Sequence, residues 1–537
     1  MWIVVFTLSF FISILNILRV LIGYFQTPKG YTYLGVGHYY QDYFEYTQQI
    51  AQGIFGHWLV QNQFTTHDPT RTLIGWGQYI FIGKLALLFH LSPFSIYWIT
   101  TFLLSIPLCM LTFLVIKKML PAVSFFQKIS AFLFCLFAAP FITFVQTNGQ
   151  WHTVPYNFWY APISLFHRIG GIPHHLLTTV IILLSILLMD KLLTRLQTRP
   201  LRTAIPPMLF LITLLLLLVT FGPLQVINIL MSFGVVSVIL MIRSIQKKQN
   251  TQAKRVLFFL LIVAFSITPF ALFIQHSHSS GELFQWVTAW EVAQQHYPAL
   301  PLVLLTIGPI LLLFPFGIWS YIRSATPVRL LVLFMTFWSY LFAATPLAKY
   351  LGTFNLRFLS PVSYMLFAVV GILGIRTIAK KFRKKIIITI TLISGFLLYF
   401  IVVTLVILRS FGTVDPISYQ PTALLDGIKH LTVYPDTRAV LTSPAASLGM
   451  ITPCLVDRNV YLGRMFFTPK YEEKITISEQ FYQGRMTSNQ ALQFLIENNI
   501  GYVLLSSTEP YSAENFQHYP FLRELMKNSA LTIYAFQ

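Results

Sequence analysis

Carboxylates are rare in the first 409 residues, and three of the six lie in one segment, residues 38–70. Asp42 and Glu45 are three residues apart, so a helix would place both on one face. Tyrosines surround them, as is typical where a helix lies at a membrane surface. A carboxylate partly withdrawn from water there holds a proton more tightly, which suits a general base. Spacing alone favours the simpler alternative, in which both acids only solvate an interfacial helix.

Three basic residues stand out on the predicted outer side of the first 409 residues: Arg168, Lys349 and Arg357. Cations at a membrane boundary suit the phosphate or pyrophosphate of a lipid carrier. The alternative is that these long side chains reach the lipid headgroups, the usual fate of Lys or Arg at a helix end. That alternative is favoured for Lys349 and left open for the two arginines.

Histidines form two further candidates, since His67 precedes Asp68 and His174 precedes His175. Neighbouring histidines on a helix point about 100° apart, so one metal ion rarely binds both. Histidines at a polar boundary are more often plain hydrogen-bonding groups. No metal site and no cofactor is therefore predicted, with a divalent cation as the alternative that remains.

Composition decides the class of protein. The 537 residues are 55% hydrophobic and 10% charged, with a mean hydropathy of +0.67 and a formal net charge of +20. Soluble globular domains carry about 25% charged residues, and a disordered chain would not contain 49 Phe. Three cysteines make no disulfide framework. A polytopic membrane protein fits better than a basic nucleic-acid-binding protein.

Apolar stretches long enough to cross a bilayer recur through residue 409. Eleven are predicted as transmembrane helices: 3–23, 95–116, 129–147, 173–190, 205–221, 223–242, 256–275, 300–322, 327–347, 358–375 and 386–408. Twenty basic residues fall in five clusters between them, and cytoplasmic loops carry such clusters. All five lie inside if 73–91 is an interfacial helix. The N-terminus is then cytoplasmic, and the loop 24–94 and everything after 409 are extracytoplasmic.

The tail, residues 410–537, is richer in charge, and we predict a small soluble α/β domain there. Short β-type runs at 439–441 and 501–505 alternate with helical patterns such as 487–499, where Thr487 or Ser488 is a plausible N-cap. Its charged residues include Arg458, Arg464 and Arg485, but no nucleophile–base pair is legible. Residues 1–409 form the predicted membrane module.

The order of these features resembles the integral-membrane glycosyltransferases of the C-type fold. The run "QDYFEYTQQIAQGIFGHWLV" is similar to the first loop of bacterial aminoarabinose transferases, of related sugar transferases to lipid A or protein, and of protein O-mannosyltransferases. There an acid begins a helix that ends about sixteen residues later in a small residue, a polar residue and Trp, here Asp42 through Gly56-His57-Trp58. "FNLRFLSP" is similar to a late motif of such enzymes. The chain departs from the family at Gln41, where a second acid is common, and at "DPTRTLIG", which replaces Pro-Pro-Leu.

The resemblance implies transfer of a sugar from a polyprenyl-phosphate donor to a lipid, glycan or protein acceptor on the outer face of the cell membrane, with inversion. Asp42 would be the base, while Arg168, Lys349 and Arg357 would hold the donor phosphate. Glu45, His67, Asp68, His174 and His175 would bind substrate. Membrane lipids are expected partners and nucleic acid is not. The alternatives are a transporter or flippase of lipid-linked substrates, which should show acids in its spans, and a catalytically silent membrane scaffold.

Overall fold

The computed structural model describes residues 1–67, 71–72, 77–157, 162–198, 201–280, 282–409, 411, 416–444 and 447–536. Packing divides the chain into two units. The first, here called the bundle unit, comprises Met1–Ile17 and Thr101–Phe411, and the second, the loop–tail unit, comprises Leu18–Thr100 and Gly412–Gln537. Residues 18–100 thus group with the tail, whereas the predicted division placed the loop 24–94 with the membrane module.

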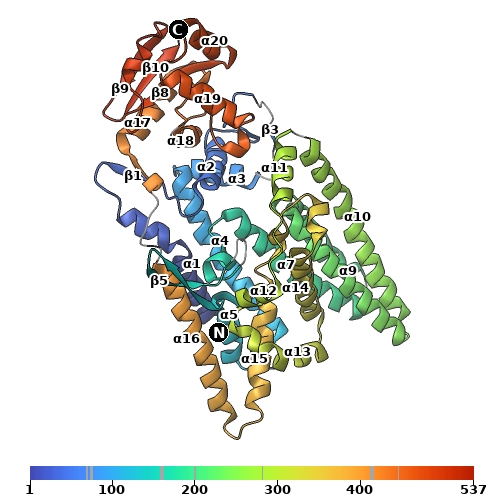
Figure 1. The fold of residues 1–537 in the computed structure, drawn as a ribbon. Coiled ribbons are helices and arrows are strands. Elements are labelled where there is room, and N and C mark those ends of the chain that lie inside the picture. The colour runs from blue at the N-terminus through green and yellow to red at the C-terminus, as the bar shows by residue number, and fades with distance from the viewer. Residues whose placement is uncertain are drawn as a thin grey trace. The chain divides into compact units, whose positions relative to one another are not determined.

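Eight helices in the described part of the chain are long and apolar enough to cross a membrane, which supports a multi-pass membrane protein. They are α1 (Trp2–Phe25), α4 (Pro93–Met119), α7 (Pro173–Thr198), α8 (Ile205–Phe221) with the turn before it, α9 (Pro223–Gln246), α10 (Asn250–Ser280), α14 (Pro327–Ala344) and α16 (Lys385–Arg409). A pair bent by 94°, α12 (Leu300–Ile307) and the segment Pro309–Arg323 containing α13 (Phe314–Arg323), would make a ninth (Figure 1). The predicted number of eleven stays a prediction.

Two predicted spans are shorter in the structure. The helix α15 (Ser363–Ala379) starts five residues later than predicted, because Pro361 lies before it and the preceding Asn355–Phe358 forms a separate 3-10 turn. The helix α5 (Phe125–Phe137) has 13 residues. The remaining short helices of the bundle unit are α6 (Leu165–Ile169) and α11 (Glu282–Ala293).

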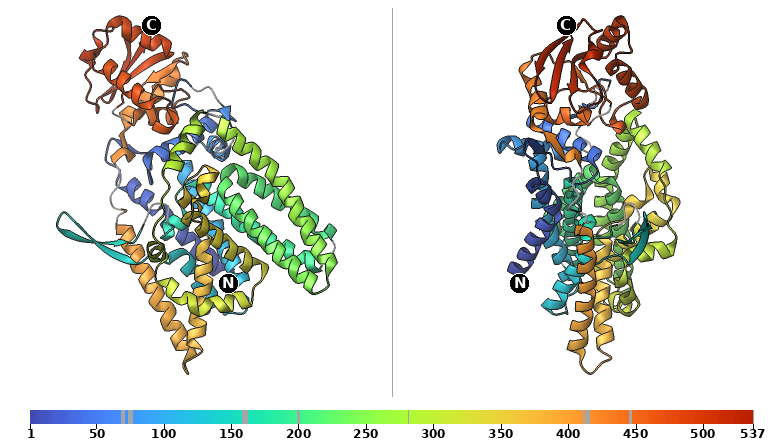
Figure 2. Two further views of the ribbon diagram at one scale, coloured as in Figure 1. Left: turned by 45° about the vertical axis from the view of Figure 1, so that its right-hand side comes forward. Right: turned by 60° about the vertical axis from the view of Figure 1, so that its left-hand side comes forward.

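The second half of the predicted span 129–147 is wrong, because the chain there forms a β-hairpin. Strands β4 (Ile142–Thr147) and β5 (Gln150–Pro155) pair antiparallel around Asn148 and Gly149, which both have positive φ. Asn-Gly is the sequence most typical of a tight hairpin turn, and Pro140 ends the helical stretch before it. In the left view of Figure 2 the hairpin extends away from the helices.

The first outer loop contributes β1 (Tyr31–Tyr33), α2 (Tyr40–Ile54), β2 (Val60–Gln61), β3 (Arg71–Thr72) and α3 (Gly77–Leu88). The helix α2 agrees with the helix predicted to carry Asp42 and Glu45. The helix α3 has 12 residues and is about 18 Å long, too short for the roughly 30 Å hydrocarbon core of a bilayer. It packs on α2 where Gly53 meets Gly83, and a side chain at either glycine would collide with the facing backbone.

The tail folds as an α/β domain, as predicted. Its sheet has the order β7 (Ala439–Leu441), β8 (Ile500–Ser506), β10 (Leu531–Phe536), β9 (Leu522–Lys527), with β7 parallel to β8 and the other pairs antiparallel. Four helices accompany it: α17 (Thr422–His430), α18 (Leu448–Leu455), α19 (Tyr471–Tyr482) and α20 (Ser488–Glu497). Thr487 caps α20 in a capping box with Gln490.

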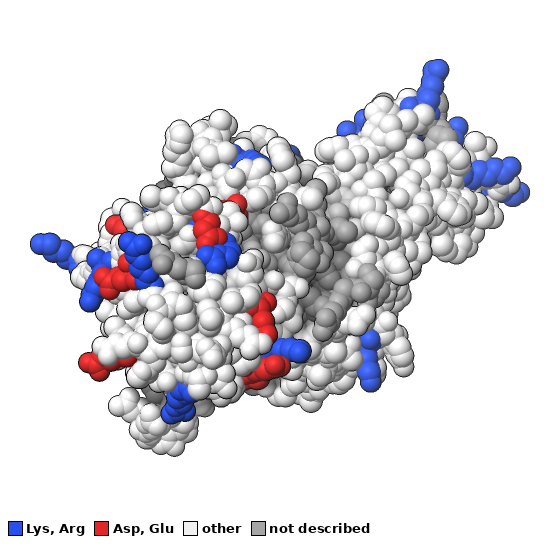
Figure 3. All heavy atoms as spheres, turned by 90° about the horizontal axis from the view of Figure 1, so that it is seen from above, with Lys and Arg blue, Asp and Glu red and all other residues white. Residues whose placement is uncertain are grey.

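The first loop and the tail are joined by backbone pairing. Strand β1 pairs antiparallel with β6 (Tyr419–Pro421), and the Val460 amide donates to the Gln63 carbonyl at 2.9 Å. His57 lies 2.7 Å from a carboxylate oxygen of Asp457. Seen from above, acidic side chains lie among basic ones on one part of the surface, and other basic side chains lie apart (Figure 3). The strand pairing and the contacts of Gln63 and His57 therefore join two distant stretches of sequence, the first outer loop and the tail.

Candidate functional site

Two acids of α2 meet one arginine of the tail. The helix places Asp42 in its first turn and Glu45 one turn on, so both carboxylates lie on one face as predicted. Arg464 forms an ion pair with each of them, through one terminal nitrogen to Asp42 and through the other to Glu45. This three-residue cluster is the centre of the candidate site.

Arg464 is held in place by its surroundings. Its side chain is only 9% exposed, and its guanidinium faces the rings of Phe466 and Phe467 at 5.6 and 5.1 Å. Burial lowers the pKa of this guanidinium, and the negative charge of Asp42 opposes that effect. An arginine remains charged in proteins even so. A rigid, buried cation therefore fixes the positions of both carboxylates.

Asp42 and Glu45 differ in their access to solvent. The Glu45 side chain is 6% exposed, and its second oxygen accepts a hydrogen bond from Gln49 at 3.4 Å. The Asp42 side chain is 33% exposed. Asp42 can therefore meet a substrate hydroxyl. Glu45, which was predicted to bind substrate, is a buried counter-ion that holds Arg464, and its contact with substrate stays a prediction.

His67 lies in a different hollow of the loop–tail unit. Its Nδ1 is 3.1 Å from the Lys474 ammonium, which is buried and also bonds to the Thr65 hydroxyl at 2.8 Å. Burial lowers the pKa of Lys474 to about 8, and burial together with Lys474 lowers the pKa of His67. A hollow of about 460 Å³ is lined by both residues. Asp68, predicted to act beside His67, lies outside the described residues.

Arg168 has a structural environment that argues against its predicted role at a donor phosphate, which stays a prediction. It is buried, with 2% exposure, and all three guanidinium nitrogens donate to backbone carbonyls, at distances of 2.9–3.3 Å. Its guanidinium lies 3.5 Å from the centre of the Tyr364 ring. Its donors are therefore committed to fixing the backbone at residues 135–136 and 162–163. The accepting carbonyls are those of Pro162, Ile163, Cys135 and Leu136.

Arg357 and Lys349 both lie in the bundle unit, in different surroundings. A terminal nitrogen of Arg357 pairs with Glu291 at 2.6 Å, and the second oxygen of Glu291 accepts from the Thr353 hydroxyl at 2.8 Å. Lys349 is exposed.

The rings of His174 and His175 lie at the start of α7, with their centroids 4.3 Å apart. In the described part of the chain, no group of three or more His, Cys, Asp or Glu residues has the arrangement of a metal site.

Two partners in these ion pairs were not predictable from residue spacing. Arg464 was one of several tail arginines without an assigned role, and it lies 422 residues from Asp42, so spacing carries no signal for the pair. Glu291 is one of the other three acids of the first 409 residues, and the sequence predicted no role for it. Its scarcity was the available signal, because an acid in so apolar a region needs a partner.

No protein-family model and no curated protein sequence matches this chain. Its fold matches solved structures. An archaeal oligosaccharyltransferase, AglB from Archaeoglobus fulgidus, in complex with an inhibitory peptide and a dolichol-phosphate, aligns with a TM-score of 0.53 at 11% identity, covering 94% of this chain and 69% of that one. The same enzyme tethered to an acceptor peptide gives 0.52 at 13% identity, with the same coverage. The arabinofuranosyltransferase AftD from Mycobacteria gives 0.50 at 12% identity, covering 98% of this chain and 41% of that one.

These matches confirm the fold implied by the resemblance, that of the C-type membrane glycosyltransferases. At such low identity the likeness concerns the fold alone. The chemistry of this chain therefore has to be argued from its own residues.

Proposed function

We propose that this protein is a membrane glycosyltransferase that moves a sugar from a polyprenyl-phosphate-linked donor to an acceptor hydroxyl, with Asp42 as the base. The observation that carries the proposal is the Asp42–Arg464–Glu45 cluster, in which one carboxylate is partly exposed and the other is buried. The fold supports it, because the solved proteins of this fold named above are an oligosaccharyltransferase and an arabinofuranosyltransferase.

In the proposed reaction, Asp42 takes the proton of the acceptor hydroxyl while that oxygen bonds to the anomeric carbon of the sugar. The bond from this carbon to the carrier phosphate breaks, and the phosphate leaves with the electron pair. Attack opposite the leaving group inverts the anomeric centre. The positive charge of Arg464 favours the ionised carboxylate that a base must present, and the buried Glu45 keeps Arg464 in position.

The leaving phosphate gains negative charge as its bond to the sugar breaks, and a cation nearby stabilises it. Arg357 and Lys349 remain the proposed residues for this task, while Arg168 is less suited to it because its donors are occupied. His67, Asp68, His174 and His175 remain proposed contacts to sugar or acceptor hydroxyls. No metal ion or cofactor is required by this scheme.

The reaction would take place on the outer face of the cell membrane. This part of the proposal depends on the basic clusters between the apolar helices, which indicate a cytoplasmic N-terminus and an extracytoplasmic tail.

The test is a transfer assay on isolated membranes with polyprenyl-phosphate-linked sugars as donors and a lipid and glycan extract of the same membranes as acceptor. We expect Asp42→Asn to lower transfer by about 100- to 10,000-fold, the contribution typical of a general base, with unchanged protein level. The matched control is Asp426→Asn, an exposed acid on α17 whose neutralisation should leave transfer unchanged. Transfer by Asp42→Asn at the control level would contradict the proposal.

A further inference from the structure

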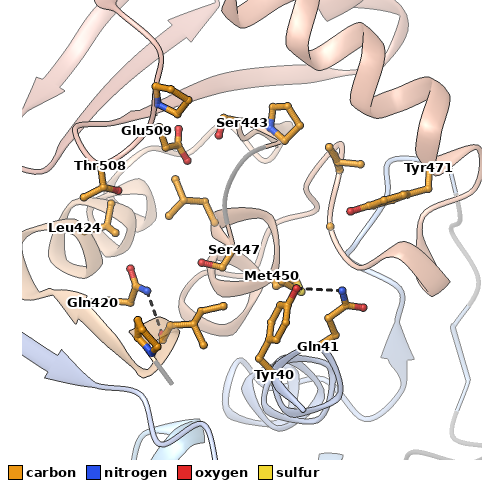
Figure 4. Close-up of a pocket in the computed structure, with 17 residues that line it drawn as sticks. Tyr40, Gln41, Gln420, Leu424, Ser443, Ser447, Met450, Tyr471, Thr508 and Glu509 are labelled. Atoms are coloured by element: carbon orange, nitrogen blue, oxygen red, sulfur yellow. Dashed lines mark hydrogen bonds between the residues drawn. The ribbon is translucent and has the colours of Figure 1, made fainter. Parts of the chain in front are cut away.

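A cavity of about 460 Å³ opens beside the first turn of α2, within the loop–tail unit (Figure 4). Its lining includes Gln41 and Gly463, the chain neighbours of Asp42 and Arg464. The other walls come from the segments around Gln420, Ser443 and Glu509. Small-molecule pockets commonly have volumes of about 300–1,000 Å³. The cavity is therefore of suitable size for a small ligand, next to the proposed base.

Several polar atoms of this lining are buried without a hydrogen bond of good geometry among the described residues, although the Ser443 hydroxyl and the Ser506 backbone lie near enough to Glu509 to favour its ionised form. They are the amide oxygen of Gln41, the hydroxyl of Ser443 and both carboxylate oxygens of Glu509. Buried polar atoms are normally paired, and an unpaired one destabilises the fold by about 1–3 kcal/mol. Three of these four atoms only accept hydrogen bonds when Glu509 is ionised. The missing partner is therefore a group rich in donors.

The orientation of Gln41 supports this reading. Its amide nitrogen donates to the Tyr40 hydroxyl at 3.3 Å, so its oxygen is the atom left over (Figure 4). None of the 17 lining residues is Lys, Arg or His. A phosphate, which offers mainly acceptors and negative charge, would meet further acceptors and no cation here. The rings of Tyr40 and Tyr471 add apolar surface to the lining.

Hydroxyl donors combined with apolar faces are the chemistry of a sugar ring. We propose that this cavity binds a neutral sugar of the acceptor, with ring hydroxyls donating to Glu509 and to the Gln41 oxygen. This assignment to the acceptor rests on the function proposed above. It places a sugar hydroxyl next to the chain segment that carries Asp42, and it makes a glycan the acceptor class.

Glu509 makes the binding dependent on pH. Burial raises the pKa of its carboxyl to about 7, and the neighbouring Ser443 hydroxyl offsets part of that effect. Hydroxyls that donate to a carboxylate favour its ionised form, so a bound sugar lowers this pKa. The affinity is then higher at pH 8 than at pH 6. Tyr482 and Tyr511 also face this charge, and burial raises the pKa of both phenols above their ordinary range, so neither titrates between these pH values.

The probe is a printed array of neutral, sulfated and phosphorylated oligosaccharides, read with the purified full-length protein in detergent. We expect the wild type to bind neutral sugars, and Glu509→Gln and Gln41→Leu to bind them at least 10-fold more weakly. The matched control Glu524→Gln changes an exposed acid on β9 and should bind as the wild type does. No binding of neutral sugars by the wild type, unaltered binding by both cavity variants, or preference for phosphorylated sugars would each overturn the inference.

The same array separates this inference from the proposed function. Asp42→Asn should retain sugar binding while losing transfer, because Asp42 does not line the cavity. Sugar binding without any transfer by the wild type would refute the function and leave the cavity assignment intact. If Glu509→Gln and Gln41→Leu leave both transfer and sugar binding unchanged, the cavity assignment is refuted and the proposed function stands.

Discussion

The guanidinium of Arg464 pairs with the carboxylate of Asp42 although 422 residues separate them in the chain. The same guanidinium also pairs with Glu45, so one buried cation faces two carboxylates that α2 holds on one face. The net charge of the cluster is negative, and its most exposed member is Asp42. A partly exposed carboxylate held by a rigid partner is the geometry that a base requires.

Removing the cation should destabilise the loop–tail unit. Arg464→Met leaves the buried Glu45 without a counter-ion, and breaking a buried pair from one side typically costs about 3–5 kcal/mol. We expect faster hydrogen exchange in strand β8 and loss of transfer. Glu45→Gln with Arg464→Met should restore part of the stability, because the uncompensated buried charge is then gone.

The comparison for this prediction is an exposed ion pair. Lys429 and Asp426 lie 3.6 Å apart on α17 and both are more than half exposed, so Lys429→Met should change stability by about 1 kcal/mol or less. Equal hydrogen-exchange rates in Arg464→Met and Lys429→Met proteins would show that the cluster does not stabilise this unit.

Glu509 should make the tail less stable as pH rises. Its pKa is raised from the ordinary 4.5 to about 7 in the folded protein, so between these values the folded state binds more protons than the unfolded state. The stabilisation is fully present below pH 4.5 and is lost as pH rises through 7, by an amount on the order of 3 kcal/mol. Hydrogen exchange in strand β8, corrected for the effect of pH on the intrinsic exchange rates, measures this loss of stability. Glu509→Gln should remove this pH dependence, and an unchanged profile in that variant would assign the dependence to another group.

Arg168 and Lys349 should behave in opposite ways. Arg168→Met leaves several buried carbonyls without their donor, so we expect a lower melting temperature of the detergent-solubilised protein. Arg168→Lys should restore little of the melting temperature, since one ammonium group does not replace the three donating nitrogens of a guanidinium. Lys349→Met, at an exposed position, should keep the melting temperature and raise the KM for the lipid-linked donor several-fold. A stable Arg168→Met protein with a raised donor KM would return Arg168 to the phosphate site.

The orientation can be tested with single cysteines, because the three native cysteines are buried. Glu524→Cys in the tail should react with a membrane-impermeant maleimide in intact cells. Lys381→Cys, between α15 and α16, should react only after permeabilisation. The opposite pattern would invert the topology.

The sequence was sufficient to predict the helical membrane architecture, the α2 helix and the shared face of Asp42 and Glu45, because apolar length and residue spacing are local properties. The strands at 439–441 and 501–505 followed from local β-type runs in the same way. The fold resemblance depended on two short runs, one around Asp42 and one around Arg357, and on the order of features.

Other features depended on contacts between distant segments. Nothing near Arg464 in the sequence distinguishes it from Arg458, which instead donates to backbone carbonyls of the tail. Arg168 looked like an exposed cation, but the fold buries it against carbonyls that only the tertiary structure supplies. The β4–β5 hairpin is a different case, because its Asn148-Gly149 turn is recognisable in the sequence. The apolar residues before this turn nevertheless led to the prediction of a transmembrane helix.

The central claim is that Asp42 accepts the proton of the acceptor hydroxyl. The most direct measurement is single-turnover sugar transfer from a polyprenyl-phosphate-linked donor by purified wild type, Asp42→Asn and Asp42→Glu, each checked for an unchanged β8 exchange pattern. We expect transfer by Asp42→Asn to be lower by about 100- to 10,000-fold, and transfer by Asp42→Glu to lie between that level and the wild type. Wild-type transfer by a folded Asp42→Asn protein would contradict it.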